Sequence, residues 1–403
     1  MDRRSALAAM ETAGQLAAVA PLDGWAPRAA ALGAYVHVPF CAKRCGYCAF
    51  NTAPYLAAAV PRFVRALERE IALAGAAPWN DGVALRTVFL GGGTPSLLAP
   101  EEVATVLEAL RAAFGIAADA EITVECNPES VTAARMAGYR AAGVTRISLG
   151  VQSLDDHLLP ALDRLHSADD ARRAFDAARA AGFPHVSLDL IYGLPGQDGA
   201  GWARTVAEAL SWGPDHLSAY ALSLDEGSAW TATGVPDLPE EDAVAAQYAA
   251  LTALAAAAGF EHYEVSNYAR PGHRSAHNQI YWRAEEYLAF GPGACGFLGD
   301  VRYSNAKPVE RYCATLEAGR LPVATHEILT ERQRLAERLF LGLRTADGVP
   351  SAWLDARAAL DPDRLPARLA GWRERGLLET REGRVRLTEA GFFLSDALFV
   401  DLL

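Results

Sequence analysis

Long apolar runs are missing from this sequence of 403 residues, since no stretch of about 18 uncharged apolar residues occurs. The Ala-rich start is interrupted by Glu11 and Gln15 before it forms the apolar segment of a secretory signal. The pattern therefore disfavours export and membrane spanning. We expect a cytoplasmic protein.

Positive charge is also scarce, because 37 Lys and Arg residues face 49 Asp and Glu residues, for a net charge of −12. A general binder of nucleic acid or of anionic membranes needs a basic face, so we expect no nucleic-acid partner. The length and the 51% apolar content are sufficient for one large domain with a smaller one, or for two to three average domains.

Cysteine is rare, with six residues in the whole chain, which excludes a scaffold built on disulfides. Three of the six nevertheless lie within eight positions, Cys41, Cys45 and Cys48, in the stretch VHVPFCAKRCGYCAFN. These three are too close together to link distant elements. In a reducing compartment such a cluster favours metal ligation.

Short runs rich in β-branched residues recur along the first half and alternate with segments of helical spacing. One such segment follows Pro100, and another begins at Ser167 with the capping pattern Ser167 to Asp170. Strand followed by helix, six times, predicts parallel strands joined by right-handed crossovers, in a full or partial (β/α) barrel. The predicted strands are 35–39, 87–90, 121–125, 146–151, 186–191 and 216–224.

The pattern changes near residue 236, where an Ala-rich helix (239–259) leads into aromatic, polar and Gly-rich stretches. The tail suggests helices around short strands near Glu382 and Gly383, as in a small winged-helix-like α+β domain. We therefore expect a poorly ordered lead-in, a barrel, a linker region and a C-terminal domain, at 1–33, 34–235, 236–326 and 327–403.

The spacing C-x3-C-x2-C has a chemical meaning of its own. Three thiolates on a four-iron cube hold three irons and leave the fourth open for a small molecule. A structural zinc site would need four closed ligands, and buried thiols without metal are a further alternative. From the residues alone, an iron–sulfur cluster is the favoured interpretation.

Several polar residues stand at the ends of the predicted strands, where a barrel carries its site. The glycines of LGGGTPS allow a ligand to approach the backbone, although a tight turn is the alternative. Asp189, in an apolar strand, needs a partner or a ligand. Arg164 is able to bind a carboxylate, although alone it would be an ordinary surface residue. Glu125 and Gln152 end two further strands.

The cysteine stretch resembles the cluster loop of the radical S-adenosylmethionine (SAM) superfamily. The motifs YVHVPFC, GGGTPS, SLGVQS, DLIYGLPGQ, HNQIYW and LTEAGFFLSDALFVDLL extend the resemblance to the oxygen-independent coproporphyrinogen-III oxidase group, over residues 34–403. The resemblance implies a [4Fe–4S] cluster on the three cysteines, with SAM on the open iron. The positions that match SAM-contacting or cluster-packing residues of the group are Tyr35, Tyr47, Gly92, Gly93, Thr94, Glu125, Gln152, Arg164 and Asp189.

That group contains porphyrinogen oxidases and haem chaperones, and two departures separate them here. The oxidases carry an extra cysteine two residues after the third, where this chain has Phe50, and a longer N-terminal arm, where only 34 residues precede Tyr35. Both departures favour a chaperone that binds haem and transfers it to acceptor proteins such as respiratory enzymes. Oxidative decarboxylation of coproporphyrinogen III is the alternative, so the resemblance leaves enzyme activity open.

Two residues are candidates for haem binding. His277, in HNQIYW, offers an imidazole beside two aromatic residues, although packing against the barrel with a backbone hydrogen bond is an equal alternative. Cys295 stands where the group usually has the histidine of a Gly-Ala-His pattern. A thiolate can replace histidine as an axial ligand of haem iron, and the alternative is a buried cysteine with a structural role only. Cys126 and Cys313 show no pattern and are expected to be inert.

The resemblance also implies partners. Haem is expected as cargo, haem-accepting proteins as recipients and a flavodoxin or ferredoxin as electron donor. Delivery would bring the protein to the periphery of a membrane, and a homodimer is left open.

Overall fold

The computed structural model describes residues 22–400 and residue 402. Most of the predicted lead-in, 1–33, lies outside the described residues, and from Ala31 onward the chain already forms a strand. Among the described helices, none has both the length and the apolar character needed to cross a membrane.

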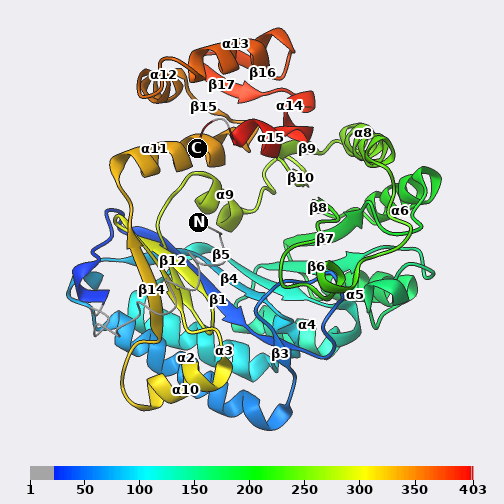
Figure 1. The fold of residues 1–403 in the computed structure, drawn as a ribbon. Helices are drawn as coiled ribbons and strands as arrows, with labels where there is room; N and C mark the ends of the chain where they lie inside the picture. The colour runs from blue at the N-terminus through cyan, green and yellow to red at the C-terminus, as the bar shows by residue number, and fades with distance from the viewer. Residues whose placement is uncertain (1–21, 401, 403) are drawn as a thin grey trace.

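The core of the fold is a parallel sheet, and all six strands predicted from the sequence are present. They lie side by side in chain order, each hydrogen-bonded in parallel to the next (Figure 1). The carboxyl ends of all six therefore meet at one edge of the sheet. The strands are β1 (Ala31–Val38), β4 (Ala84–Gly92), β5 (Ile116–Cys126), β6 (Arg146–Gln152), β7 (His185–Tyr192) and β8 (His216–Ala221).

Amphipathic helices connect these strands and cover the outer face of the curved sheet (Figure 1). The predicted helix after Pro100 is confirmed, and its buried face includes Val103, Leu107 and Phe114. The predicted capping box at Ser167 is confirmed as well, since its side chain accepts from the backbone N–H of Asp170. The connecting helices are α2 (Val60–Gly75), α3 (Pro100–Phe114), α4 (Ala133–Ala142), α5 (Ala168–Ala180) and α6 (Gly199–Ser211).

Residues 236–326 extend this sheet at both edges instead of forming a separate linker. On one side β11 pairs in parallel with β1 and is followed by antiparallel strands; on the other, β10 pairs with β8. The added strands are β9 (Glu261–Glu264), β10 (Asn267–Ala269), β11 (Tyr287–Phe290), β12 (Cys295–Leu298), β13 (Val301–Asn305) and β14 (Val323–Ile328). The helices of this region are α8 (Glu241–Ala257), α9 (Ala276–Trp282) and α10 (Val309–Glu317).

The tail forms a second unit of helices around a three-stranded sheet, with its own buried apolar cluster. The predicted turn lies between two of its strands, where Glu382 and Gly383 both have positive φ angles, as a tight hairpin requires. This matches the expected winged-helix-like α+β unit, orange to red in Figure 1. Its elements are α11 (Glu331–Leu343), β15 (Val349–Pro350), α12 (Ser351–Ala359), α13 (Leu365–Glu374), β16 (Leu378–Arg381), β17 (Arg384–Leu387), α14 (Glu389–Phe393) and α15 (Ser395–Phe399).

Candidate functional site

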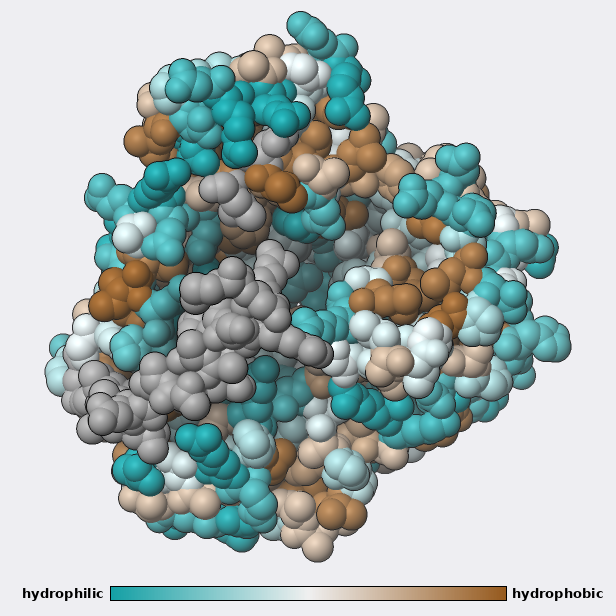
Figure 2. Space-filling view, viewed as in Figure 1, coloured by the Kyte–Doolittle hydropathy of each residue, from teal (hydrophilic) through white to brown (hydrophobic). Residues whose placement is uncertain are grey.

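A cavity of about 370 Å³ opens at the carboxyl ends of the parallel strands. Its volume lies within the range of small-molecule and cofactor sites. Figure 2 shows this face of the molecule hollowed between the C-terminal helices and the parallel strands, with hydrophilic residues in the wall of the hollow. Predicted site residues that line the cavity are Cys41, Cys45, Tyr47, Cys48, Gly92, Gly93, Thr94, Glu125, Gln152, Arg164 and Asp189.

The three cysteines reach the cavity on one loop that follows the short strand β2 (Phe40–Cys41). Within the loop, the N–H of Cys48 donates to the carbonyl of Cys45 at 3.1 Å. The Thr94 hydroxyl donates to the Cys41 sulfur at 3.7 Å, which joins the loop to the glycine segment. Burial raises the pKa of the Cys41 thiol to about 11 and also raises that of Cys48, so both thiols are neutral in the absence of a cation.

Two other elements hold this loop in place. The N–H of Gly46 donates to the Asp163 carboxylate at 3.1 Å, and Lys43 forms an ion pair with the same carboxylate at 2.7 Å. On the other side, the Trp230 N–H donates to the Gly46 carbonyl at 3.0 Å, from the short helix α7 (Ala229–Thr233). The Trp230 ring also packs against Tyr47, with centroids 6.0 Å apart.

The glycine segment after β4 forms one wall of the cavity. The N–H of Gly92 donates to the Glu125 carboxylate at 3.1 Å. A Cβ at Gly93 would lie within 2.6–2.8 Å of backbone atoms of Pro39 and Phe40, so only glycine allows the segment to pass this close to the cysteine loop.

Two carboxylates lie at the bottom of the cavity. Burial, with a further contribution from Asp189, raises the pKa of Glu125 to about 7. Burial likewise raises the pKa of Asp189 to about 6, although hydrogen bonds from Ser148 and Ser218 oppose the shift. Two buried carboxyl groups with raised pKa values, together in one cavity, are a common feature of functional sites, and a bound cation would favour their charged forms.

Gln152 and Arg164 complete the wall. The bulge at the end of β6 gives Gln152 a φ of 66°, an uncommon conformation for a residue with a side chain. Arg164 donates to the Asn127 side chain at 2.9 Å and to the Gly150 carbonyl at 2.5 Å, and lies 3.9 Å from the Cys45 sulfur. Its Nε atom is buried without a hydrogen-bond partner, so the guanidinium retains capacity for an anionic group.

These features fit the implied cofactors. Three thiols, an arginine with a spare donor and two acids of raised pKa surround one space of cofactor size. Within residues 22–400 and 402, no group of three or more His, Cys, Asp or Glu side chains is arranged to hold a metal ion directly. A [4Fe–4S] cube takes one thiolate per iron, so the three thiols of this loop would hold three irons and leave the fourth open.

Tyr35 differs from the other predicted SAM residues, because it does not line this cavity. Its side chain faces a second interior cavity of about 220 Å³, which shares Glu125 and Asp189 with the first. The Tyr35 hydroxyl lies 3.0 Å from the Nδ1 atom of His37, since alternate residues of β1 face the interior of the barrel.

His277 is fully buried, and both of its ring nitrogens have partners. Nδ1 lies 2.8 Å from the Thr87 hydroxyl, Nε2 lies 2.7 Å from the Tyr281 hydroxyl, and the ring stacks on Phe89. Burial lowers the pKa of the imidazole to about 3, so it is neutral. In this conformation His277 is not accessible to haem iron, and the arrangement matches the packing alternative, with side chains in place of the backbone as partners.

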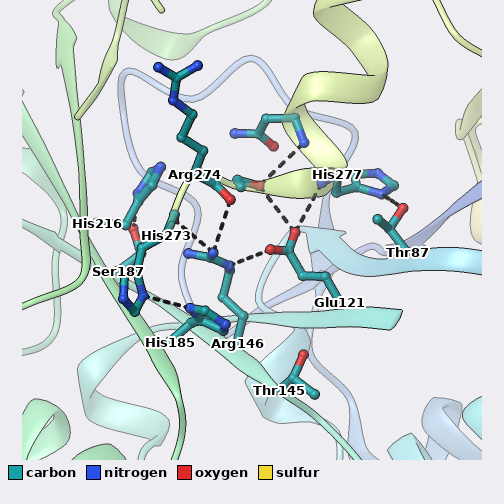
Figure 3. Close-up of polar contacts among 12 residues, drawn as sticks. Thr87, Glu121, Thr145, Arg146, His185, Ser187, His216, His273, Arg274 and His277 are labelled. Carbon is teal, nitrogen blue, oxygen red and sulfur yellow. Dashed lines mark hydrogen bonds and ion pairs between the residues drawn. The ribbon is translucent and has the colours of Figure 1, made fainter. Parts of the chain in front are cut away.

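A buried polar network fixes the start of the helix that carries His277 (Figure 3). Arg146 donates to the Glu121 carboxylate at 2.9 Å and to the His273 carbonyl at 3.0 Å. Glu121 in turn accepts from the backbone N–H of His277 at 3.0 Å. The motif HNQIYW is therefore attached to the interior of the barrel, away from the cysteine loop.

Cys295 is exposed at the start of β12, unlike the buried cysteine of the alternative interpretation. Burial of its sulfur raises its pKa, while Lys307 and Arg302 lower it. Cys313 is buried in α10. Cys126 is buried as well but lines the main cavity, next to Glu125.

Sequence reasoning missed several residues that line the cavity or hold the cysteine loop in place. Asn127 bridges Arg164 and Thr94; its position two residues after Glu125, at a strand end, was a usable signal. Tyr220 lies at the end of β8 and offered the same signal. Asp163 and Trp230 had no local signal, because their role depends on contacts with a loop far away in the sequence.

Comparison with known proteins identifies the family. The Radical SAM superfamily model matches residues 35–209, and the HemN C-terminal domain model matches residues 329–394. The chain is 41% identical over 395 residues to a Mycobacterium tuberculosis protein named "Heme chaperone HemW", covering 96% of this chain and 98% of that one. The Bacillus subtilis protein of the same name is 35% identical, covering 91% and 97% of the two chains.

Among solved structures, Escherichia coli coproporphyrinogen III oxidase (HemN), a radical SAM enzyme, matches with a TM-score of 0.81 and 24% identity, covering 92% of this chain and 89% of that one. This second likeness shows the fold alone, the radical SAM barrel with its C-terminal domain. The 35–41% identity to proteins named as haem chaperones, over more than nine tenths of the chain, is the stronger finding, and the chain belongs to the HemW family of radical SAM proteins.

Proposed function

We propose that this protein is a haem chaperone that binds haem and transfers it to acceptor proteins, and that it carries a [4Fe–4S] cluster and SAM. The main support for the chaperone function is that position 50 is Phe and not Cys. Phe50 lines the cavity beside the three cysteines and is 67% exposed. A cysteine there would resemble the oxidases, whereas the apolar ring gives the mouth of the cavity a surface on which a flat apolar molecule can pack.

Cys41, Cys45 and Cys48 would hold the cluster, which supplies an open iron for SAM and an electron for its cleavage. Arg164 would bind the SAM carboxylate through its spare donor, and the glycine segment would accommodate the methionyl part. Glu125 and Asp189 would lose their protons to accompany the positive charge of the ligand.

Of the two haem-ligand candidates, Cys295 is favoured over the buried His277, because Cys295 is an exposed residue and Lys307 and Arg302 act to lower the pKa of its thiol. An electron donor of the flavodoxin or ferredoxin type and a homodimer remain predictions.

A direct experiment separates chaperone from oxidase. The purified protein, reconstituted with iron and sulfide without oxygen, is first titrated with haem and then supplied with coproporphyrinogen III, SAM and a reductant. We expect saturable haem binding, seen as a shift of the haem absorbance, and no protoporphyrinogen. Steady production of protoporphyrinogen would overturn the proposal in favour of the oxidase.

Replacing Cys45 by Ala tests the cluster assignment in the same preparation. We expect about four iron atoms per chain in the wild-type protein and a near-complete loss in C45A, because the cube loses one of three ligands. Cys313→Ala is the matched control, since it removes a buried thiol outside the cavity. Equal iron content in C45A and C313A would refute the ligand assignment.

A further inference from the structure

A third cavity, of about 120 Å³, lies between the barrel and the C-terminal unit. Helix α9 and the segment before it form one wall, and α11, α12 and β17 form the other. Its walls carry four arginines and two tryptophans but a single carboxylate, that of Asp347. We call it the arginine cavity, and its charged and aromatic residues are Arg274, Arg283, Arg338, Arg384, Trp282 and Trp353.

Two of the four arginines already have partners. Arg274 forms ion pairs with Asp347 at 3.1 Å and with Glu261 at 3.2 Å. Arg384 donates to the carbonyls of Asp347 at 2.7 Å and Gly348 at 2.6 Å. The acidic groups around the cavity are thus used by Arg274.

The other two arginines have no carboxylate partner within residues 22–400. The Arg283 guanidinium donates to the neutral Gln279 side chain, at 2.7 Å. Arg338 makes no hydrogen bond or ion pair with any described residue, and its guanidinium lies over the Trp353 ring, 5.9 Å from the centroid. Both residues are exposed, so water also solvates their charges, but neither has a carboxylate partner among the described residues of a chain with twelve more acidic than basic residues.

Arginine is the side chain best suited to bind oxyanions, because its planar donors match two oxygens of a carboxylate or phosphate. Like charges gathered around one space repel each other unless an anion compensates them. The cavity has room for about four water molecules, which is enough for one such group. Its volume is well below the roughly 300 Å³ or more that drug-sized ligands need. The cavity is therefore too small for a porphyrin.

We propose that the arginine cavity binds a single oxyanionic group, a phosphate or a carboxylate, through Arg283 and Arg338. The two arginines come from opposite walls, one at the end of α9 and the other from α11. A bound anion therefore joins the barrel to the C-terminal unit and stabilises their docking. This site is separate from the cysteine cavity and does not depend on haem or SAM.

The test is a calorimetric titration of the purified full-length protein, without cluster, with inorganic phosphate and with acetate at constant ionic strength. We expect saturable binding of at least one anion by the wild-type protein. R283Q and R338Q should each weaken binding about tenfold, the loss expected for one charge-assisted contact. Arg332→Gln is the matched control, because Arg332 is exposed on the same helix α11 and does not line the cavity.

The two titrations also identify the source of the group. Tighter binding of phosphate indicates a free or ligand-borne phosphate, and tighter binding of acetate indicates a carboxylate, such as one on a partner protein. Absence of saturable binding for both anions overturns the proposal, as does unchanged affinity in the R283Q/R338Q double variant.

Discussion

At the scale of the residue, the buried Glu125 carboxylate destabilises the protein without cofactors. Its carboxylate lines the cavity and has only one hydrogen-bond donor described, the Gly92 N–H. Burial and the neighbouring Asp189 raise its pKa to about 7. Because the folded-state pKa lies above the unfolded value, the group lowers the stability of the fold as pH rises from about 4.5 to about 7.

We therefore predict that Glu125→Gln stabilises the protein without cofactors at pH 8 by about 2 kcal/mol and has little effect near pH 4. The same change should weaken SAM binding to the reconstituted protein, since the negative charge is lost. Urea unfolding at the two pH values measures the first effect. Glu108→Gln, on the exposed face of α3, is the control and should change neither quantity. Equal stabilisation at both pH values would contradict the assignment of the effect to ionisation.

At the scale of the element, the cysteine loop owes its conformation to contacts with two other segments. Gly46 lies between Asp163 and Trp230: its N–H donates to the Asp163 carboxylate, and its carbonyl accepts from the backbone N–H of Trp230. A Cβ added at Gly46 would lie 2.2 Å from the Trp230 indole nitrogen. Since the Trp230 backbone is hydrogen-bonded to Gly46, the ring cannot easily move away from the added Cβ.

Gly46→Ala should accordingly displace the cysteine loop and lower the stability of the protein by about 1–3 kcal/mol. It should also reduce the amount of iron that the protein binds on reconstitution. In a Trp230→Ala background the added methyl meets no ring, so the same substitution should have a smaller effect. Iron content and thermal stability of the four proteins of this double-mutant cycle give the coupling. Gly199→Ala, where the structure leaves open space, controls for the loss of a glycine. Additive effects of the two substitutions would disprove the contact.

The sequence predicted those features that depend on residues close together in the chain. The six strands and the two predicted helix starts depend on short-range patterns and are present in the structure. The polar residues at strand ends also gave a local signal, and most of them line the cavity, whereas Tyr35 does not. The strands β11 to β14 were missed because they are short and depend on pairing, β11 with β1 and each of the others with its neighbour. The position of HNQIYW was equally hidden, since Arg146 and Glu121 fix it across more than 120 residues of sequence.

At the scale of the whole molecule, a polar cluster joins the C-terminal unit to the barrel. The Glu389 carboxylate, at the start of α14, accepts from the Tyr248 hydroxyl at 2.7 Å and contacts His262 at 2.8 Å. Thr252 lies 3.3 Å from the same oxygen. Apolar packing supports the contact, because the His262 ring lies beside Phe392 of the same helix.

Glu389 should therefore contribute to the docking in a pH-dependent way. Burial alone would raise its pKa, but the bonds from His262, Tyr248 and Thr252 outweigh burial and lower it. A carboxylate with a lowered pKa stabilises the fold fully above its ordinary value of about 4.5, and the contribution disappears as pH falls through the lowered value.

Glu389→Gln should thus destabilise the protein by about 1 kcal/mol at pH 7, a modest value because the side chain is 48% exposed. The difference from wild type should shrink as pH falls below about 4.5, where the wild-type carboxylate gains its proton. Urea unfolding of both proteins at several pH values measures it, with Glu374→Gln on the exposed face of α13 as control. A difference that stays constant from pH 7 to pH 3 would show that hydrogen-bond geometry, and not the charge of Glu389, holds the two units together.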